Sequence, residues 1–395
     1  MRNVGTVVRG IRTPIIKEND DLASIVVDSL LKASESEGFN FRDKDIVAIT
    51  EAVVGISEGN YVTVDDIATD LAEKFPSKNI GVVFPILSRN RFSMILKGIA
   101  RGMDKVTILL SFPSDEVGNG ILDEDVLDKS KYDLSSVITE EEYYETFGDF
   151  LHPFTGINMV DFYKDLIEGE NCKAEFVFSN NPKEILNYTK DVLTCDIHTR
   201  LHTKNMIEEA GADTVYGLFE VMNKSINGSG FNPMYGLLGS NKSTEERLKL
   251  FPKTGDVLVE KIQKDLFEKT GKNIEVMVYG DGAFKDPVGH IWELADPVVS
   301  PAYTSGLEGT PNEIKLKYVS DNKFADLRGE ELKKAIKEEI KAKDKNLKGQ
   351  MITQGTTPRR LTDLIGSLCD LTSGSGDKGT PVVFIQGYFD NLADE

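Results

Sequence analysis

Short apolar runs alternate with helix-like stretches between residues 80 and 219, and this alternation limits the folds open to the chain more than any other feature. Helical periodicity separates several of the runs, as at 91–101 and at 182–190, where Asn181 would cap the helix and Pro182 would start it. Strands that alternate with helices in this way favour a doubly wound parallel sheet. The apolar runs lie at 80–84, 106–112, 174–179, 191–197 and 214–219.

The rest of the chain shows further strands and helices of ordinary length. Strands are predicted at 4–8 and 46–50, and Asn19 or Asp20 is placed to cap a helix between them. The acidic, irregular stretch 113–150 is expected to be a surface elaboration. Later helices are predicted at 254–270 and 330–345.

The charge balance and the cysteine content argue against several classes of protein. The chain has 395 residues, with 46 lysines and arginines against 65 aspartates and glutamates, and a formal net charge of −19. Non-specific nucleic-acid binding needs a broad basic surface that displaces counterions, so we expect no nucleic-acid partner. The three cysteines (Cys172, Cys195 and Cys369) have no CxxC spacing and favour a reducing compartment. No apolar run approaches the roughly 20 residues of a membrane span, and no signal peptide is visible, so we expect a cytoplasmic protein without a membrane partner.

The segment 274–281, IEVMVYGD, is an apolar strand that ends on Asp281 and is followed by glycine. A carboxylate at the end of a strand is held firmly and offers the oxygen ligand that hard divalent cations prefer. Asp281 is therefore a candidate metal ligand. The acids that follow it, Asp286, Glu293 and Asp296, are expected only to solvate a loop.

A helix is predicted to begin after Thr357, which is a good N-cap, with Pro358 at its first position. Arg359 and Arg360 would then lie in the first turn, where each cation is unfavourable by about 0.3–1 kcal/mol. An anion bound at the start of the helix would account for both arginines. An outward orientation toward nearby acids would account for them equally well.

A glycine-rich loop, TSGSGDKGTP, follows this helix and precedes an apolar strand. Gly374, Gly376 and Gly379 have the spacing GxGxxG, but the motif leaves a helix and enters a strand, which is the reverse of a dinucleotide fold. The loop also lacks the GK[ST] ending of a P-loop. It is nevertheless able to turn several backbone N–H groups toward phosphate. A flexible connector is the alternative, and the pattern alone does not decide between the two.

These segments together resemble the coenzyme F(420)-0:L-glutamate ligases, the gamma-glutamyl ligase family. GIRTPIIKENDDLA (10–23) is similar to the family's nucleotide-contacting opening, and DIVAITEAVVGISEG (45–59) to the strand and loop after it. GSNKSTEERLKLFP (239–252) stands where the family has a loop of glycine, aspartate, serine and asparagine. VYGDGAF (278–284) is similar to the strand with a metal-binding aspartate, and 361–387 to the closing helix, glycine-rich loop and strand.

The resemblance covers residues 1–80 and 236–395 and leaves 81–235 without a counterpart. It implies a discontinuous α+β ligase core in the matching parts. Residues 81–235 would form an inserted, doubly wound α/β domain. The whole chain is therefore expected to have an α/β fold.

The resemblance implies an amide ligase that adds L-glutamate or a related amino acid to a small carboxylate through an acyl phosphate. GTP or ATP would be the phosphoryl donor, Mg²⁺ or Mn²⁺ would neutralise the phosphate charge, and the protein would be a homodimer. The implied metal ligands are Asp281, Asn241 and Asp377. The implied nucleotide-binding residues are Arg12, Thr13, Pro14, Ile15, Thr50, Glu51, Thr244, Gly374, Ser375, Gly376 and Asp377.

The chain departs from the family pattern at positions that bear on the chemistry. Ile56 stands where the family has a lysine, Asn241 where it has a metal-binding aspartate, and Thr244 where an asparagine follows. An asparagine offers an oxygen ligand without a charge, so metal affinity falls unless Asp286 or Asp377 compensates. The metal site is therefore either rebuilt or impaired.

Two clusters in the predicted inserted domain carry polar side chains. Arg89 and Arg91 flank the start of a helix just after the strand at 80–84, and we predict an anion-binding pocket there for a substrate carboxylate or phosphate. His198 and His202 have the i, i+4 spacing of a helical zinc pair. The run before them looks like a strand leading into a loop, so a solvent-facing or hydrogen-bonded pair is the preferred interpretation.

Three functions stay open at this point, and the ligase is preferred. The second is a homologue that has lost catalysis and binds a nucleotide or metabolite, which Ile56 and Asn241 favour. The third and weakest is a metal-dependent hydrolase centred on Asp196, His198 and His202. The sequence identifies neither a catalytic residue nor the acceptor.

Overall fold

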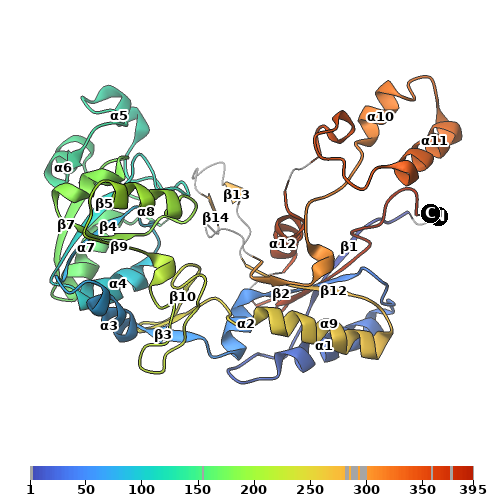
Figure 1. Cartoon of the computed structure of the whole chain (residues 1–395), viewed down its shortest axis with the longest axis horizontal. Helices are drawn as coiled ribbons and strands as arrows, with labels where there is room; N and C mark the ends of the chain where they lie inside the picture. Colours follow the sequence, from blue (N-terminus) through green and yellow to red (C-terminus); the bar gives the residue numbers. More distant parts are fainter. Residues whose placement is uncertain are drawn as a thin grey trace.

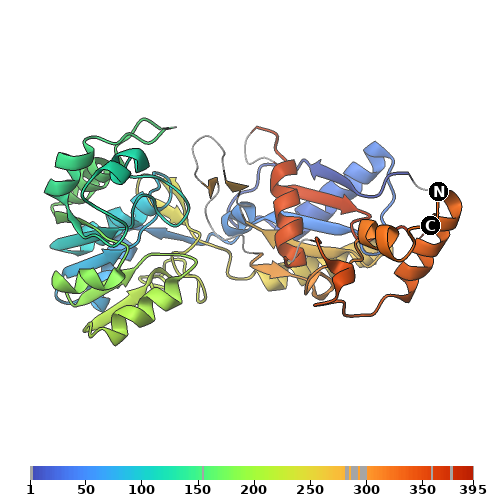
Figure 2. The ribbon, with the colours of Figure 1, turned by 90° about the horizontal axis from the view of Figure 1, so that it is seen from above.

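The computed structural model of the chain describes residues 3–153, 155–280, 300–356, 359–373 and 377–394, and the backbone of two short strands at 284–285 and 292–293. Its elements form two units, one built on a five-stranded sheet and one on a six-stranded sheet (Figure 1). The two units lie end to end, and residues near both chain ends lie at the far end of the first unit (Figure 2). We call the first the core unit (3–60 and 251–394) and the other the second unit (61–250). The predicted α/β fold is confirmed.

The sheet of the core unit has the strand order β1–β16–β2–β12–β15. β2 and β12 are parallel, and β16 lies antiparallel between β1 and β2. The chain therefore leaves β1, β2 and β12 at the same edge of the sheet at which it enters β16, and we call this the carboxyl edge. The strands are β1 (Val7–Ile11), β2 (Ile46–Thr50), β12 (Glu275–Tyr279), β15 (Ala302–Tyr303) and β16 (Val382–Gln386).

Helices cover both faces of this sheet, and the strand residues alternate between them because side chains in a strand have a period of two. Val47 and Ile49 pack with helices α1 (Leu22–Glu37) and α9 (Gly255–Thr270). Ile46 and Ala48 pack on the opposite face with helix α12 (Leu361–Thr372). All four side chains are fully buried. A smaller cluster joins helix α11 (Gly329–Ala342) to residues on either side of helix α10 (Leu316–Asn322) and to Leu392 and Ala393 near the C-terminus.

Two helix starts differ from the predictions. Asp21, rather than Asn19 or Asp20, caps α1, because its carboxylate accepts the backbone N–H of Ser24. Helix α12 begins at Leu361, with Arg360 in the N-cap position and no side-chain cap. The prediction that Arg359 and Arg360 lie in its first turn is therefore wrong. Both arginines are exposed and precede the helix, and the predicted cap at 357–358 lies outside the described residues.

The second unit contains the predicted doubly wound sheet, in the order β6–β7–β5–β4–β8–β9. The strands from β7 to β9 are parallel, and β6 is antiparallel to β7. From β4 the chain moves through β5 to β7 on one side, whereas β8 and β9 follow on the other side. The winding direction thus changes between β4 and β8. The strands are β4 (Asn79–Val83), β5 (Lys105–Leu110), β6 (Ile138–Thr139), β7 (Lys173–Phe178), β8 (Asp191–Thr194) and β9 (Thr214–Gly217).

Helices and 3₁₀ turns connect these strands, and two predictions need correction. The segment predicted as a helix at 182–190 is a 3₁₀ turn, η1 (Pro182–Asn187), although Asn181 caps it as expected. The stretch 113–150 is more than a surface elaboration, because Tyr143 within it is buried and stacks on Phe178 with ring centroids 4.3 Å apart. The helices are α4 (Phe92–Gly102), α5 (Glu124–Lys129), α6 (Glu140–Phe147), α7 (Met159–Gly169) and α8 (Arg200–Glu209).

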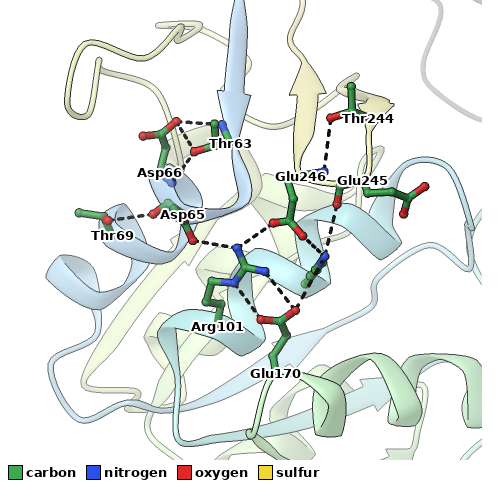
Figure 3. A network of polar contacts seen from close by, with 10 residues as sticks. Thr63, Asp65, Asp66, Thr69, Arg101, Glu170, Thr244, Glu245 and Glu246 are labelled. Carbon is green, nitrogen blue, oxygen red and sulfur yellow. Dashed lines mark hydrogen bonds and ion pairs between the residues drawn. The ribbon is translucent and has the colours of Figure 1, made fainter.

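A three-stranded sheet lies on the side of the second unit that faces the core unit (Figure 1). Arg101 of α4 anchors this sheet, because its guanidinium contacts Glu246, Asp65 and Glu170, each at 2.8 Å (Figure 3). Lys97 forms a second ion pair with Glu246. In chain order, the elements that connect the strands of the two large sheets here are α2 (Glu51–Ser57), β3 (Tyr61–Thr63), α3 (Val64–Lys74), β10 (Asn241–Thr244) and β11 (Arg247–Lys249).

The apolar core of the second unit extends beyond the predicted limits at residues 81 and 235. It begins at Val62 and ends at Leu250, so that α3 and the β10–β11 hairpin pack with the six-stranded sheet. We propose on this basis that an inserted domain spans residues 61–250. Within the described residues, no helix is both long and apolar enough to cross a membrane.

Candidate functional site

Segments distant in sequence meet at the carboxyl edge of the core sheet. The backbone N–H of Thr13, just after β1, donates to the carbonyl of Gly379 at 3.3 Å. The N–H of Thr50, at the end of β2, donates to the carbonyl of Pro381 at 2.9 Å. The segment at 12–15 and the chain that enters β16 therefore lie side by side, with the end of β2 next to them.

A pocket of about 1050 Å³ opens along this edge. One wall is a single stripe of α1, which runs from Ile25 to Ser36 at helical spacing. The opposite wall combines the segment 9–14 with the end of α12 and the chain before β16. The volume is at the upper end of the range for cofactor sites, about 300–1,000 Å³. The lining residues are Arg9, Gly10, Ile11, Arg12, Thr13, Pro14, Ile25, Asp28, Ser29, Lys32, Ala33, Ser36, Glu37, Phe39, Thr372, Lys378 and Thr380.

The pocket has a surplus of positive charge and an unpaired buried hydroxyl. Among the described residues, Arg12, Lys32 and Lys378 form no ion pair. Arg9 is already engaged, since its guanidinium bonds Gln386 at 2.9 Å. The Oγ1 of Thr380 is buried and has no hydrogen-bond partner in the described part of the chain. A buried hydroxyl without a partner is uncommon, and a bound phosphate or ribose oxygen would satisfy it.

Gly10 explains how the two walls come so close. A Cβ atom at this position would lie 3.1 Å from the Cβ of Thr380. The absence of a side chain on β1 therefore lets the chain before β16 pack directly against it. The close approach holds Thr380 against the floor of the pocket.

Glu51 and Lys249 form a buried ion pair next to this edge. Their side chains are each 7% exposed, and the ammonium nitrogen lies 2.5 Å from the carboxylate oxygen. Glu51 is the first residue of α2, and Thr50 caps that helix by accepting the N–H of Ala52 at 3.2 Å. Lys249 is on β11, where it pairs in register with Asn241 of β10. Asn241 therefore lies on the hairpin that contacts the carboxyl edge.

The other predicted site residues are dispersed. Thr244 is exposed near the far end of the hairpin, where its hydroxyl accepts the N–H of Glu246 at 3.4 Å beside the network of Figure 3. Pro14 is exposed but lines the pocket, whereas the exposed Asp377 and Ile15 do not, and neither do Arg359 and Arg360. Asp281, Gly374, Ser375 and Gly376 lie outside the described residues. In the chain as described, no cluster of three histidine, cysteine or acidic side chains could hold a metal ion.

The polar residues predicted in the second unit do not form a metal site. His198 precedes α8 and His202 lies within it, and both are exposed, so the pair does not share a helical face. Arg89 is exposed and lines a separate, smaller pocket, whereas Arg91 occupies the N-cap position of α4. The three cysteines are free and buried.

Several residues of the pocket and of the neighbouring ion pair were not predicted from the sequence. Asp28 and Lys32 line the pocket together with the buried Ser29, but their one-turn spacing on α1 carries no signal of a binding site. Lys249 interrupts the apolar run RLKLF, and a lysine at such a position needs a buried partner. Lys378 and Thr380 lie in the glycine-rich loop, from which only Gly374, Ser375, Gly376 and Asp377 had been named as candidate site residues.

Comparison with known proteins gives one result for nearly the whole chain. The family model described as F420-0:Gamma-glutamyl ligase matches residues 10–387. No curated protein matches the chain.

Proposed function

The chain belongs to the F420-0:gamma-glutamyl ligase family and is a ligase, and we propose that its nucleotide binds in the pocket at the carboxyl edge of the core sheet. The observation that carries this proposal is the meeting of Arg12, Lys378 and the orphaned hydroxyl of Thr380 around one large cavity. Three cations without ion pairs in the described chain fit a polyphosphate better than a neutral ligand. The apolar side chains of Ile25, Ala33 and others in the pocket fit a base or sugar.

The residues of this pocket would act by binding and by electrostatics. A bound nucleoside triphosphate supplies the phosphoryl group that converts the acceptor carboxylate into an acyl phosphate, from which the amine of glutamate displaces inorganic phosphate. Negative charge spreads over the transferred phosphoryl oxygens in such a reaction. Arg12 and Lys378 would stabilise that charge, and the backbone of the glycine-rich loop would add N–H donors. We propose GTP as the donor, with ATP as the alternative.

Dependence on Mg²⁺ or Mn²⁺ is proposed from the resemblance alone. The described residues contribute Asn241 and the exposed Asp377, which do not make a metal site without Asp281. A homodimer is likewise proposed from the resemblance.

The test is a pair of measurements on the full chain. Equilibrium titration with a fluorescent GTP analogue should give a dissociation constant that Lys378→Gln weakens by about 10- to 100-fold, the loss expected for one charge-assisted hydrogen bond. Lys348→Gln, a matched change of an exposed lysine in the C-terminal helical region, should leave it unchanged. Equal affinity of Lys378→Gln and the unmodified protein would place the nucleotide elsewhere.

The second measurement separates a ligase from a catalytically impaired homologue. The protein is incubated with GTP, Mg²⁺ or Mn²⁺, glutamate and a mixture of small carboxylates. Phosphate release together with a mass gain of one glutamyl unit on an acceptor is the expected result. Tight nucleotide binding without either signal would favour the homologue that only binds.

A further inference from the structure

A second cavity, of about 340 Å³, lies in the second unit where the chain leaves its parallel strands. It is about a third of the size of the core pocket and is too small for a nucleotide. Residues after β4 and residues after β5 form much of its wall. The lining residues are Leu87, Ser88, Arg89, Asn90, Asn119, His152, Thr155 and Met159.

The topology of the sheet makes this edge a natural ligand site. In open α/β sheets, ligands bind beyond the carboxyl ends of the strands, next to the point where the winding direction changes. In the second unit that point lies between β4 and β8. The segment from Leu87 to Asn90 follows β4 directly, so the cavity is beside the change of direction.

The lining of the cavity is cationic or neutral. None of its eight residues is acidic, although the chain has 65 acidic residues against 46 basic ones. Arg89 contributes a guanidinium group, and burial, followed by the charge of Arg89, lowers the pKa of His152 from its ordinary value. The Oγ1 of Thr155 is buried and has no hydrogen-bond partner within the described residues.

Asp115, which bonds to two residues of the cavity wall, is already engaged. Asp115 accepts bonds from the backbone N–H groups of Leu87, Val117 and Asn119 and from the side-chain amide of Asn119. Burial raises its pKa to about 6. Asp115 therefore fixes the loops on both sides of the cavity, and its oxygen atoms already accept these four bonds.

One hairpin contacts both this cavity and the core pocket's edge. The carbonyl of Asn90, which lines the cavity, accepts the backbone N–H of Lys242 on β10 at 2.9 Å. On the other strand of the same hairpin, in the adjacent residue pair, Lys249 binds Glu51 at the start of α2. The cavity is thus on the part of the second unit that faces the ligase core, where an acceptor would have to lie.

We propose that this cavity binds an oxyanion, a carboxylate or phosphate group, that the acceptor carries in addition to the carboxylate that becomes the amide. The inference rests on the proposed ligase function. Arg89 supplies the charge, and the hydroxyl of Thr155 and the amide of Asn119 supply hydrogen bonds. The acceptor is therefore a small molecule with at least two anionic groups, which spans from the second unit to the core.

Histidine NMR tests the proposal directly, because the chain has only four histidines. The full-length protein, labelled on histidine and free of nucleotide, is titrated at constant ionic strength with inorganic phosphate and, separately, with succinate. One imidazole signal, assigned to His152 by its loss in His152→Gln, should shift and saturate with at least one of the anions. The anion that saturates at the lower concentration identifies the phosphate or carboxylate class.

Arg89→Gln supplies the decisive comparison. Arg89 is exposed, so the substitution should leave folding intact, and the apparent affinity for the anion should fall by at least tenfold. Arg328→Gln, which removes an exposed arginine that donates to the neighbouring carbonyl groups of Ala325 and Leu327, should titrate like the unmodified protein. A His152 signal that neither anion moves, or that moves equally in Arg89→Gln, would overturn the proposal.

Failure here is distinguishable from failure of the proposed function. The titration contains no nucleotide and does not depend on turnover. If the protein binds nucleotide and transfers glutamate but neither anion shifts the His152 NMR signal, only the oxyanion cavity is refuted. A saturable anion effect with no nucleotide binding would refute the core pocket instead.

Discussion

Breaking the ion pair between Lys249 and Glu51 should destabilise the protein strongly. Both side chains are 7% exposed, and the ammonium nitrogen lies 2.5 Å from the carboxylate oxygen. Lys249→Met removes the ammonium that lies against the buried Glu51 carboxylate. Removal of one partner of a buried pair costs about 3–5 kcal/mol. The double variant Lys249→Met/Glu51→Gln has no uncompensated charge, so it should regain about 2 kcal/mol or more of that loss.

Chemical unfolding of the four proteins of this cycle measures the coupling energy. The control is a second cycle on Lys323 and Glu339, whose charged atoms are also 2.5 Å apart but whose lysine is 57% exposed. An exposed pair of this kind should show a coupling of less than about 1 kcal/mol. Additive losses at Lys249 and Glu51, equal to those of the control pair, would refute the view that burial makes this contact important.

Three further predictions follow from other parts of the molecule. Burial raises the pKa of Glu116 from 4.5 to about 7, so the folded chain binds more protons than the unfolded chain between these values. The free energy of unfolding should therefore fall by up to about 3 kcal/mol as the pH rises through that window, and the Glu116→Gln variant, unfolded in urea at pH 5 and pH 7.5, should lack this part of the fall. Gly98→Ala should lower stability by about 1–3 kcal/mol, because the new Cβ would lie 2.6 Å from Cγ2 of Ile67. The same change at Gly169, another helical glycine with nothing within 4 Å, should be neutral or stabilising in a thermal melt. Asp281→Asn should abolish metal-dependent turnover while the melting temperature stays within a few degrees, and activity retained after this change would contradict the metal assignment.

The elements that the sequence predicted well are those whose apolar pattern is local. β2 was expected at 46–50 and lies at Ile46–Thr50, and β4 was expected at 80–84 and lies at Asn79–Val83. A buried parallel strand is a continuous apolar run, and nothing else in these segments competes with that pattern. The prediction that 113–150 is a surface elaboration was wrong for the opposite reason. The many acidic residues of this segment outweigh its aromatic residues in the apolar pattern, yet aromatic residues such as Tyr143 are buried in the core.

The candidate site was harder to predict because its parts are far apart in the chain. The ion pair of Glu51 and Lys249 joins residues 198 positions apart. Arg12 and Lys378 line one pocket only because β1 and β16 are neighbouring antiparallel strands. Sequence periodicity reports which face of an element is buried, but it carries no information on which strands become neighbours. Resemblance to a family supplied that information for the segment at 12–15 and for the glycine-rich loop.

The departure at Ile56 carries less weight against catalysis once the packing around it is known. The family's lysine at this position would bring a positive charge to α2, the helix after β2. Here the neighbouring Gly55 packs against Lys249, so closely that a Cβ on Gly55 would lie 3.3 Å from the lysine Cδ. An ammonium group is therefore present at this edge, although it comes from another part of the chain and is bound to Glu51. Asn241 stands where the family has a metal-binding aspartate, and no described residue supplies a carboxylate in its place. This replacement is therefore the main argument for a homologue that has lost catalysis.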